Sequence, residues 1–462
     1  MTAVIEQRVG VETADAAPPA PVQRAAQAHP ATVFAAIATG ALATVALWWH
    51  DTGSIHGFGD WLTNAGRITG LLAGYGVVVL VALMARIPPL ERGIGADRLA
   101  RWHAHGGRYT VSLVVAHGLL ITWGYAVTAH TDVVSQAGTL LTSYPDVLMA
   151  TVAGLLLVGV GVVSARASRR RLHYETWHYL HFYTYLAVAL AFSHQFATGN
   201  DLMANRMARL FWSALYLGVA TAIAWYRFAV PIRQAYRHRL RVTAVYPEAD
   251  GVCSIVIGGR RLAELGAEAG QFFRWRFLTR SLWWAANPYS LSAAPRGDSL
   301  RITVKALGDH SAALARLRPG TRVLAEGPYG ALTAGRRSRR KVLLIAGGIG
   351  ITPLRALFES LPAGPGELTL VYRVNRDADA AFADELTEIA DRRGARLQIV
   401  IGYHGTLDHD PLSPAALTTS FPDLREHDVY LCGPNAMTAA AQAALREAGV
   451  PRRRIHSESF AF

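Results

Sequence analysis

Residues 101–125, RWHAHGGRYTVSLVVAHGLLITWGY, decide the architecture of this chain because they place two histidines inside an apolar run. The interval from His103 to His117 is close to four helical turns. Both imidazoles therefore lie on nearly the same side of a helix, about 21 Å apart along its axis. Ionisable side chains inside a membrane-spanning helix indicate a functional site. The stretch thus predicts two ligand sites stacked along one helix.

Five further segments are apolar enough to cross a bilayer, which takes about 20 residues each. With the opening stretch they give six: 30–49, 66–86, 103–125, 146–165, 177–197 and 208–226. A buried helix of a soluble protein would explain any one of them. Six in succession predict a transmembrane six-helix bundle over residues 30–230.

Arginines gather in alternate loops of this predicted bundle, and this bias sets its orientation. The loops 50–64 and 126–145 contain no Lys or Arg, and the loop before the sixth segment contains Arg206. The basic loops hold Arg86, Arg92, Arg98 and Arg101, then Arg166, Arg169, Arg170 and Arg171, and finally Arg227, Arg233, Arg237 and Arg239. We therefore expect a multi-pass protein of the cell inner or plasma membrane with both termini in the cytoplasm.

Composition narrows the class of protein further. The net charge of +13 does not come from basic patches interleaved with aromatic residues, so we expect no nucleic-acid partner. Cys253 and Cys432 are too few to hold an iron–sulfur cluster by four thiolates and form no disulfide framework. Residues 1–29, rich in Ala, Pro and Gln, lack the pattern of a cleaved signal and predict a disordered cytoplasmic tail.

The segment 177–197 supplies a possible partner for each histidine of the opening stretch. It carries His181 near its cytoplasmic end and His194 near its outer end. The pairs His103/His181 and His117/His194 could each hold one haem between two imidazoles. The interval from His181 to His194 is one residue shorter, which places these two imidazoles about 140° apart on an ideal helix. Either that helix is locally distorted or one ligand is wrong, and His105 or His178 could replace an inner ligand, although their spacings fit four turns less well.

The second half of the chain has a different texture. Short alternating runs such as RLRVTAVY, CSIVIG and LRITVKAL predict an antiparallel β-barrel over 231–335. From 336 to 462, strand-like runs such as KVLLIAG and LTLVYR alternate with helical segments, which predicts an open parallel α/β sheet of the nucleotide-binding kind.

Turns at the ends of these predicted strands carry the chemistry. A Tyr and a hydroxyl in the stretch 287–292, NPYSLS, could lie against a flavin ring, although a proline-initiated turn explains it equally well. Residues 302–305 and 308–311 could supply amides, a cation and a hydroxyl to a pyrophosphate. The glycine turn 346–353, AGGIGITP, and the later CGP turn lie at the carboxyl edge, where open α/β sheets bind ligands. Arg373 is placed to contact a ribose 2′-phosphate.

The ordered combination of paired histidines, NPYSLS, GGIGITP, CGP and a terminal aromatic residue resembles the ferric reductase/NADPH oxidase superfamily over roughly residues 30–462. The resemblance implies a ferric-reductase-like membrane domain joined to a ferredoxin–NADP reductase-type dehydrogenase, with FAD, NADPH and two b-type haems as cofactors. It makes His103, His117, His181 and His194 the haem ligands, and this family tolerates both of the histidine spacings found here. It makes Phe462, the terminal aromatic that stacks on the flavin, and Cys432 the predicted catalytic residues.

The same resemblance assigns the cofactor-binding positions. The flavin motif often begins with His or Arg, which can contact the FAD diphosphate, whereas this chain has the neutral Asn287, and Lys305 is a candidate to supply the missing charge. Arg67 is a further candidate, as a cation for a haem propionate or an anionic acceptor, with a lipid headgroup contact as the alternative. The predicted cofactor-binding set is Arg67, Tyr289, Ser290, Leu291, Ser292, Val304, Lys305, Ser311, Gly347, Gly348, Gly350, Thr352, Pro353, Arg373, Cys432, Gly433, Pro434 and Phe462.

The expected function is a transmembrane oxidoreductase that passes electrons from cytosolic NADPH through FAD and the inner and outer haems to an acceptor at the outer face. A flavin is needed because a hydride carries two electrons and haem iron accepts one. The acceptor is either dioxygen, giving superoxide, or a ferric chelate, and no residue separates these two. The alternative is a membrane haem and flavin subunit that delivers electrons to a protein or quinone partner.

Overall fold

The computed structural model describes residues 4–6, 28–168, 174–402 and 411–458. Contacts divide the chain into two compact units. The first, which we call the helical unit, comprises residues 28–90 and 98–228. The second, the reductase unit, combines the described residues of 1–27, 91–97 and 229–462.

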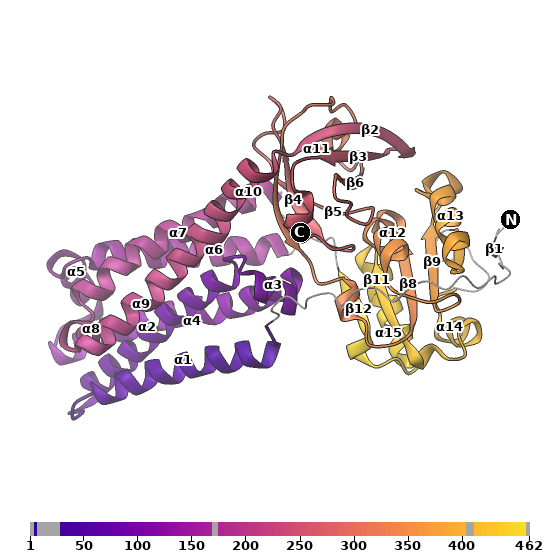
Figure 1. The fold of residues 1–462 in the computed structure, drawn as a ribbon. Coiled ribbons are helices and arrows are strands. Elements are labelled where there is room, and N and C mark those ends of the chain that lie inside the picture. Colours follow the sequence, from indigo (N-terminus) through magenta and orange to yellow (C-terminus); the bar gives the residue numbers. More distant parts are fainter. Residues whose placement is uncertain (1–3, 7–27, 169–173, 403–410, 459–462) are drawn as a thin grey trace. The chain divides into compact units, whose positions relative to one another are not determined.

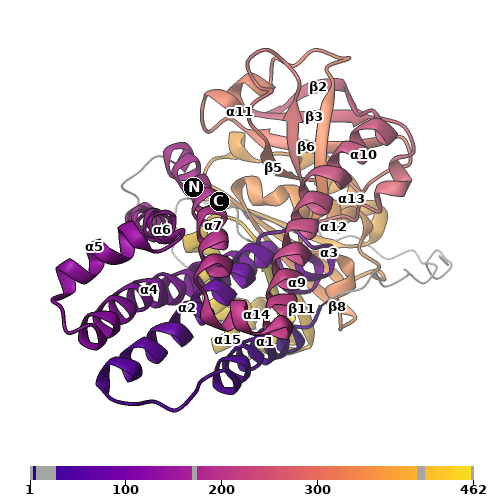
Figure 2. The same ribbon diagram turned by 90° about the vertical axis from the view of Figure 1, so that its left-hand side faces the viewer.

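The helical unit is built from long apolar helices that run along one another (Figures 1 and 2). They and their short connecting helices are α1 (Pro30–His50), α2 (Phe58–Leu83), α3 (Pro88–Ile94), α4 (Ala96–Thr128), α5 (Val133–Ser143), α6 (Val147–Ser168), α7 (Tyr174–Ala197), α8 (Asn200–Ala204) and α9 (Arg206–Ile223). A π-helical turn (Ala224–Ala229) then leads into α10 (Val230–His238), which, like residues 91–94 of α3, belongs to the reductase unit. Capping side chains fix where several of these helices begin. At the start of α9, the Asn205 carboxamide oxygen accepts hydrogen bonds from the backbone amides of Met207 and Ala208.

All six predicted membrane segments are helical, with some changes at their ends. Among the described residues, five helices are long and apolar enough to cross a membrane, and α7 is not one of them. Its histidines, tyrosines and glutamine lower its mean hydropathy, so the count of six spans is not confirmed. Helix α2 begins at Phe58, eight residues before the predicted start at 66. Helix α5 occupies a stretch that the sequence analysis treats as a loop.

The β part of the reductase unit consists of two antiparallel three-stranded sheets, ordered β2-β3-β6 and β5-β4-β7. Isolated bridges Arg241↔Arg322 and Leu291↔Ile302 link them, so the prediction of a barrel is not confirmed in full. Fully buried side chains such as Phe273, Trp275 and Ile302 form a shared core. The elements are β2 (Arg241–Ala249), β3 (Val252–Gly258), β4 (Phe272–Phe277), β5 (Asn287–Ser290), β6 (Ser299–Lys305), α11 (Asp309–Leu314) and β7 (Val323–Tyr329).

A six-stranded sheet completes the reductase unit, ordered β1-β10-β9-β8-β11-β12. Its strands are β8 (Lys341–Gly347), β9 (Leu368–Val374), β10 (Arg396–Ile401), β11 (His427–Cys432) and β12 (Ile455–Glu458), all parallel, and the antiparallel edge strand β1 (Val4–Glu6). Its helices are α12 (Ile351–Ser360), α13 (Ala383–Arg393), α14 (Pro414–Ser420) and α15 (Asn435–Glu447). One hydrophobic core contains side chains of α12 and α13, and a second contains those of α14 and α15. The helices thus cover both faces of the sheet, as the strand–helix alternation predicts.

Strand β1 corrects the prediction of a disordered tail. Val4, Ile5 and Glu6 pair with Val400, Ile399 and Gln398 of β10, so these three residues are part of the sheet. The strand has only three residues, and the surrounding segment is rich in Ala and Pro, so the sequence pattern did not predict it. Of the rest of the predicted tail, residues 1–3 and 7–27 lie outside the described residues. Ala28 and His29 are described, since the Ala28 amide donates to the Pro89 carbonyl and His29 caps α1.

Candidate functional site

The outer histidine pair lies at a cavity inside the helical unit. His117 on α4 and His194 on α7 face each other with ring centroids 6.4 Å apart and an interplanar angle of 61°. Both line a cavity of about 470 Å³, a volume within the usual range for a cofactor pocket. Gly70 of α2 leaves the room for His117, because a Cβ atom at that position would lie 2.5 Å from the imidazole Nδ1. The cavity thus depends on a glycine of the neighbouring helix.

Hydrogen bonds orient the two outer imidazoles. His117 Nδ1 lies 2.8 Å from the Gly66 carbonyl oxygen, so Nδ1–H donates to it and Nε2 keeps its lone pair. Thr198 Oγ1 donates to the His194 carbonyl at 3.0 Å and lies 2.8 Å from His194 Nδ1. Because the Thr198 hydroxyl proton is used in the bond to the carbonyl, the hydroxyl oxygen accepts a hydrogen bond from His194 Nδ1–H. Partners of this kind hold metal-ligating histidines in the tautomer that presents Nε2.

The inner pair has a similar arrangement. His103 on α4 and His181 on α7 have ring centroids 5.8 Å apart at an interplanar angle of 66°. His103 Nδ1 lies 3.1 Å from the Leu80 carbonyl oxygen, and the Trp177 ring centroid lies 5.3 Å from that of His181. The alternative inner ligand His105 is exposed and its Nδ1 bonds to the Arg101 carbonyl at 2.7 Å. The structure therefore pairs the predicted histidines, and α7 does so as a continuous helix despite its shorter histidine spacing.

These separations fit two imidazoles on opposite sides of one metal ion. Metal–imidazole bonds of ~2 Å place the two ring centroids about 6 Å apart, close to both observed values. Among the residues that the structure describes, no group of three or more His, Cys, Asp or Glu side chains could hold a metal ion. Two protein ligands per site suit an iron whose remaining positions are filled by a porphyrin, so the residues present fit a haem.

Arg67 also lines this cavity, but its charge is already paired. Its Nε donates to an Asp201 carboxylate oxygen at 3.1 Å, its Nη2 contacts the other oxygen, and Nη1 donates to Asn64 Oδ1 at 3.0 Å. The Asp201 side chain is 5% exposed and that of Arg67 16%. Because α2 begins at Phe58, Arg67 lies within this helix and not at its start. A propionate or anionic acceptor would therefore have to share Arg67 with Asp201.

In the reductase unit, the predicted flavin residues lie on and just after β5. Tyr289 is partly exposed, and its carbonyl accepts a hydrogen bond of 2.9 Å from Trp275 Nε1. Burial raises the pKa of Tyr289 to about 12, so its phenol stays protonated at neutral pH. Ser290 is buried, the fully buried Leu291 belongs to the hydrophobic core, and the Ser292 hydroxyl accepts from Thr303 Oγ1 at 2.7 Å. Tyr289 thus has a partly exposed side chain that a flavin ring could cover, next to the buried Ser290.

The predicted pyrophosphate residues are divided between core and surface. Val304 is buried in the hydrophobic core, so its backbone alone could reach a cofactor, whereas Lys305 ends β6 with a partly exposed side chain. The Ser311 hydroxyl accepts from the Leu307 and Gly308 amides and donates to the Gly308 carbonyl, so it caps the local turn.

Asn287 has a partner that the sequence did not reveal. Its Nδ2 donates to His310 Nδ1 at 2.8 Å, and His310 Nε2 is buried with no hydrogen-bond partner among the described residues. Burial lowers the pKa of His310, which favours its neutral form. Because His310 Nδ1 accepts this hydrogen bond, the proton of the neutral imidazole is on Nε2. An orphaned donor at the predicted diphosphate position fits an anionic group and offers what the neutral Asn287 lacks.

The structure brings the two predicted nucleotide turns together at the carboxyl edge of the sheet. A Cβ atom at Gly350 would lie 2.6 Å from the Gly433 nitrogen and would also meet the Cys432 carbonyl oxygen, so glycine is required for this approach. The Thr352 hydroxyl donates to the Ile349 carbonyl at 3.0 Å. Arg373, at the end of β9, is in register with Gly347. The remaining predicted residues of these turns, Gly348, Pro353, Gly433 and Pro434, lie in the same two segments.

Of the two predicted catalytic residues, only Cys432 lies in the part of the chain that the structure describes. Cys432 is fully buried in the core of the sheet, and its part beside the reacting nicotinamide stays a prediction. Phe462 lies outside the described residues, as do Arg169, Arg170 and Arg171 of the predicted basic loop. Asp201, Gly66 and Leu80 were missed because their contacts join different helices. Thr198 lies only four residues after His194, so this spacing could have revealed it. His310 and Arg301 could have been found, since both are polar residues on elements that also carry predicted flavin contacts.

Comparison with known proteins agrees with this division into a helical and a reductase unit. The family described as "Ferric reductase like transmembrane component" matches residues 69–192, and "Oxidoreductase NAD-binding domain" matches residues 344–443. The chain belongs to the ferric reductase-like superfamily. The first match includes His103, His117 and His181 and ends two residues before His194. The first match falls on helices α2 to α7, and the second falls on the parallel sheet of the reductase unit.

Individual relatives of this ferric reductase-like protein cover its reductase half. It is 32% identical to the ferredoxin reductase component of 3-ketosteroid-9-alpha-monooxygenase from Mycolicibacterium smegmatis over 48% of this chain and 65% of the relative. It is 32% identical to ferredoxin–NADP reductase B from Sorangium cellulosum over 37% of this chain and 77% of the relative. Among solved structures, the FAD/NAD-binding domain of a Vibrio cholerae nitric oxide dioxygenase is 24% identical over 48% of this chain and 98% of that one, with a TM-score of 0.39. The chain spans less than two-thirds of the ketosteroid reductase components that it matches.

Proposed function

We propose that this protein is a transmembrane oxidoreductase that carries electrons from cytosolic NADPH through FAD and two b-type haems to an acceptor at the outer face. The observation that supports it best is the pair of facing histidine sets on α4 and α7, with ring centroids 5.8 and 6.4 Å apart. They occur in the same chain as a NAD-binding oxidoreductase domain. When bound, FAD converts a two-electron hydride into single electrons, and haem iron accepts these one at a time.

In this proposal the helical unit holds and orients the haems. His103 and His181 hold the inner haem, and His117 and His194 the outer one. The carbonyls of Leu80 and Gly66 and the Thr198 hydroxyl keep three of these imidazoles in the Nε2-presenting tautomer. Helices α2, α4, α6 and α7 exclude water from the outer site, whose lining is mostly apolar. Because Arg67 and Asp201 carry opposite charges, this ion pair adds no net charge to the outer cavity.

The reductase unit binds the two nucleotide cofactors. Tyr289 and Ser290 present a ring and a hydroxyl to the flavin, and His310 Nε2–H with Lys305 would face the diphosphate of FAD. The Gly347–Gly350 turn and the Cys432–Pro434 turn allow the nicotinamide nucleotide close to the backbone at the edge of the sheet. Arg373 would bind the ribose 2′-phosphate, which favours NADPH over NADH, and Phe462 would cover the flavin until nicotinamide displaces it.

A second candidate follows from the relatives, whose names describe ferredoxin reductase components that serve monooxygenases. In that case the protein would deliver electrons to a protein or quinone partner and not to dioxygen or a ferric chelate. Purified protein given NADPH separates these possibilities, because a terminal oxidase or ferric reductase turns over with superoxide formation or ferric chelate reduction and no added partner. Turnover that requires an added carrier would favour the second candidate.

The test of the haem assignment is a dithionite-reduced minus oxidised absorption spectrum of detergent-purified protein, with haem counted per chain. We expect b-type bands and two haems per chain. His117→Ala and His103→Ala should each lower the count to about one, whereas His105→Ala, an exposed histidine on the same helix, should retain two. Absence of a b-type signal, or loss of a haem in His105→Ala, would contradict the assignment.

A further inference from the structure

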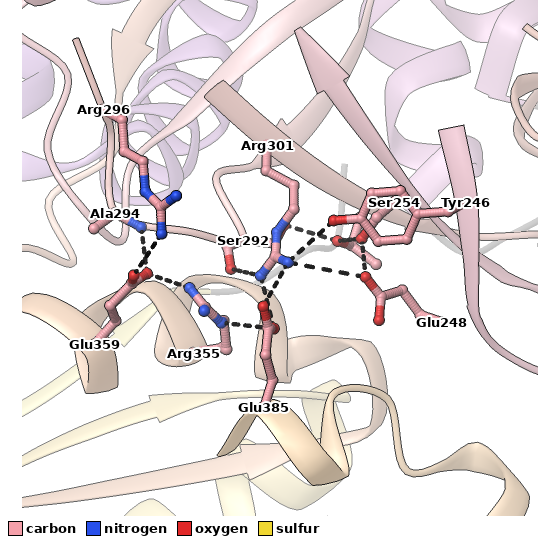
Figure 3. A network of polar contacts seen from close by, with 11 residues as sticks. Tyr246, Glu248, Ser254, Ser292, Ala294, Arg296, Arg301, Arg355, Glu359 and Glu385 are labelled. Carbon is pink, nitrogen blue, oxygen red and sulfur yellow. Dashed lines mark hydrogen bonds and ion pairs between the residues drawn. The ribbon is translucent and has the colours of Figure 1, made fainter. Parts of the chain in front are cut away.

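A polar seam joins the β part of the reductase unit to its nucleotide-binding part, residues 336–462, and it is built on Arg301 of β6. Along β6, Leu300, Ile302 and Val304 are buried in the hydrophobic core, so the alternate residue Arg301 points away from it. Nevertheless, only 10% of the Arg301 side chain is exposed to solvent, because the nucleotide-binding part covers it. Figure 3 shows Arg301 among carboxylates and hydroxyls that come from both parts.

Arg301 forms a forked ion pair with Glu385 of α13. Its Nη1 donates to Oε1 at 2.8 Å and its Nη2 to Oε2 at 2.9 Å. The same Nη2 donates to the Ser292 carbonyl at 3.0 Å, and the guanidinium carbon lies 5.0 Å from the Phe382 ring centroid. A two-point arginine–carboxylate pair fixes direction as well as distance. Arg301 thus ties the last residue of the flavin motif to the start of α13.

Arg355 and Glu359 make a second connection from the same seam (Figure 3). Arg355 Nε donates to Glu385 Oε2 at 3.1 Å, and its Nη1 is paired with Glu359. The Glu359 carboxylate accepts from the Ala294 amide at 3.0 Å. Both residues belong to α12, the helix that begins directly after the glycine turn. The segment that follows the flavin motif is therefore held to the helix that carries the nicotinamide nucleotide turn.

The charges of this seam persist at neutral pH. Although burial raises the pKa of Glu385, the hydrogen bond from Arg301 and the charges of Arg355 and Arg301 hold it below its usual range. Burial likewise raises the pKa of Glu359, and the Ala294 amide with Arg355 lowers it further than burial raises it. Ion pairs of a buried arginine contribute little net stability compared with apolar packing. The two-point pairing of Arg301 with Glu385 fixes the direction of the contact. This points to a role in alignment.

We infer that Arg301, Arg355, Glu359 and Glu385, here called the arginine–glutamate seam, position the nicotinamide nucleotide turn against the flavin motif for hydride transfer. This rests on the proposed function, because it assumes that FAD lies at Tyr289–Ser290 and NADPH at Gly347–Gly350. The seam residues act through the segments that they hold and touch neither cofactor. Small displacements matter here, since a shift of about 1 Å at a reacting pair can cost roughly 100-fold in rate.

The experiment compares the full-length, cofactor-loaded protein with Glu385→Gln and Arg301→Lys, two changes that keep the side-chain size or charge and lose the fork. Glu264→Gln, which removes an exposed ion pair with Arg237, is the matched control. Anaerobic stopped-flow mixing with NADPH measures the limiting rate of flavin reduction and the apparent Kd separately. Hydrogen exchange of the peptide that contains Ala294 reports on the seam without any activity.

We expect the limiting rate to fall about 10-fold or more in both seam variants, with unchanged FAD content and an unchanged apparent Kd for NADPH. The long-wavelength charge-transfer absorbance of the nicotinamide–flavin complex should weaken, and the Ala294 amide hydrogen should exchange faster. The control should match the wild type. Wild-type rates in both seam variants, or a rate loss that only follows loss of bound FAD, would overturn the inference. A wild-type protein whose flavin NADPH does not reduce would overturn the proposed function instead, whatever the variants do.

Discussion

The imidazoles of the outer pair depend on single contacts that decide which nitrogen is presented to the cavity. Thr198 makes such a contact with His194, since its Oγ1 lies 2.8 Å from Nδ1. Thr198→Val keeps the shape and removes the hydroxyl. Loss of such a partner typically lowers metal affinity about 10- to 100-fold, so we expect weaker retention of one haem. Haem per chain after extended dialysis, with a redox titration of the two components, measures this.

Thr122→Val is the control for that substitution. Thr122 also donates to the carbonyl four residues before it, at 2.7 Å, but it is only partly buried and, among the hydrogen bonds of the described residues, has none with a histidine. A loss of haem that is the same in both variants would show that removing a helix-bound hydroxyl has a general effect on the bundle. It would contradict the specific role of Thr198.

At the scale of elements, the glycine turn before α12 and the end of β11 approach so closely that no side chain fits between them. In Gly350→Ala the new Cβ would meet the Cys432 carbonyl oxygen and the Gly433 nitrogen, and both contacting groups are backbone. We expect the turn to move and NADPH-dependent flavin reduction to fall roughly 100-fold. Haem reduction by dithionite should be unchanged. Stopped-flow traces with each reductant give both values.

Gly335→Ala serves as the control for the turn. The nearest atom to its new Cβ would be Thr333 Oγ1 at 3.5 Å, an ordinary contact. This variant should keep the wild-type rate of flavin reduction. If Gly350→Ala also kept it, the backbone approach would have no part in nucleotide binding.

The spacing of His181 and His194 along α7 does not fit whole helical turns, although the structure places both opposite the histidines of α4. Periodicity let the sequence predict the elements and place His103 and His117 on one side of α4, because their spacing is close to four helical turns. It also predicted that the turns of Gly347–Gly350 and Cys432–Pro434 share one sheet edge. Periodicity could not predict contacts between residues far apart in the sequence. Arg301 and Glu385 are 84 positions apart, and Arg67 and Asp201 are 134 positions apart. One signal was available, since a charged Arg301 alternates with Leu300 and Ile302 along one strand, but nothing local indicated its partner.

At the scale of the whole molecule, the charge of the loops makes a prediction about the two sides of the membrane. Positively charged loops remain in the cytoplasm, which would leave the reductase unit on that side and the His117/His194 pair nearer the outer face. NADPH does not cross membranes. Intact right-side-out vesicles should therefore leave added NADPH unoxidised, and inside-out vesicles should oxidise it while an impermeant ferric chelate or a superoxide probe trapped inside them is reduced.

His117→Ala completes that experiment, because it should break the path at its outer end. Inside-out vesicles of this variant should still reduce a soluble dye added on the NADPH side, since Tyr289, the glycine turn and the seam are unchanged. They should no longer reduce the trapped acceptor. Oxidation of NADPH by sealed right-side-out vesicles would contradict the orientation, and continued reduction of the trapped acceptor by His117→Ala would contradict the outer pair as the exit for electrons. Which trapped probe responds in wild-type vesicles would assign the acceptor as dioxygen or as ferric iron.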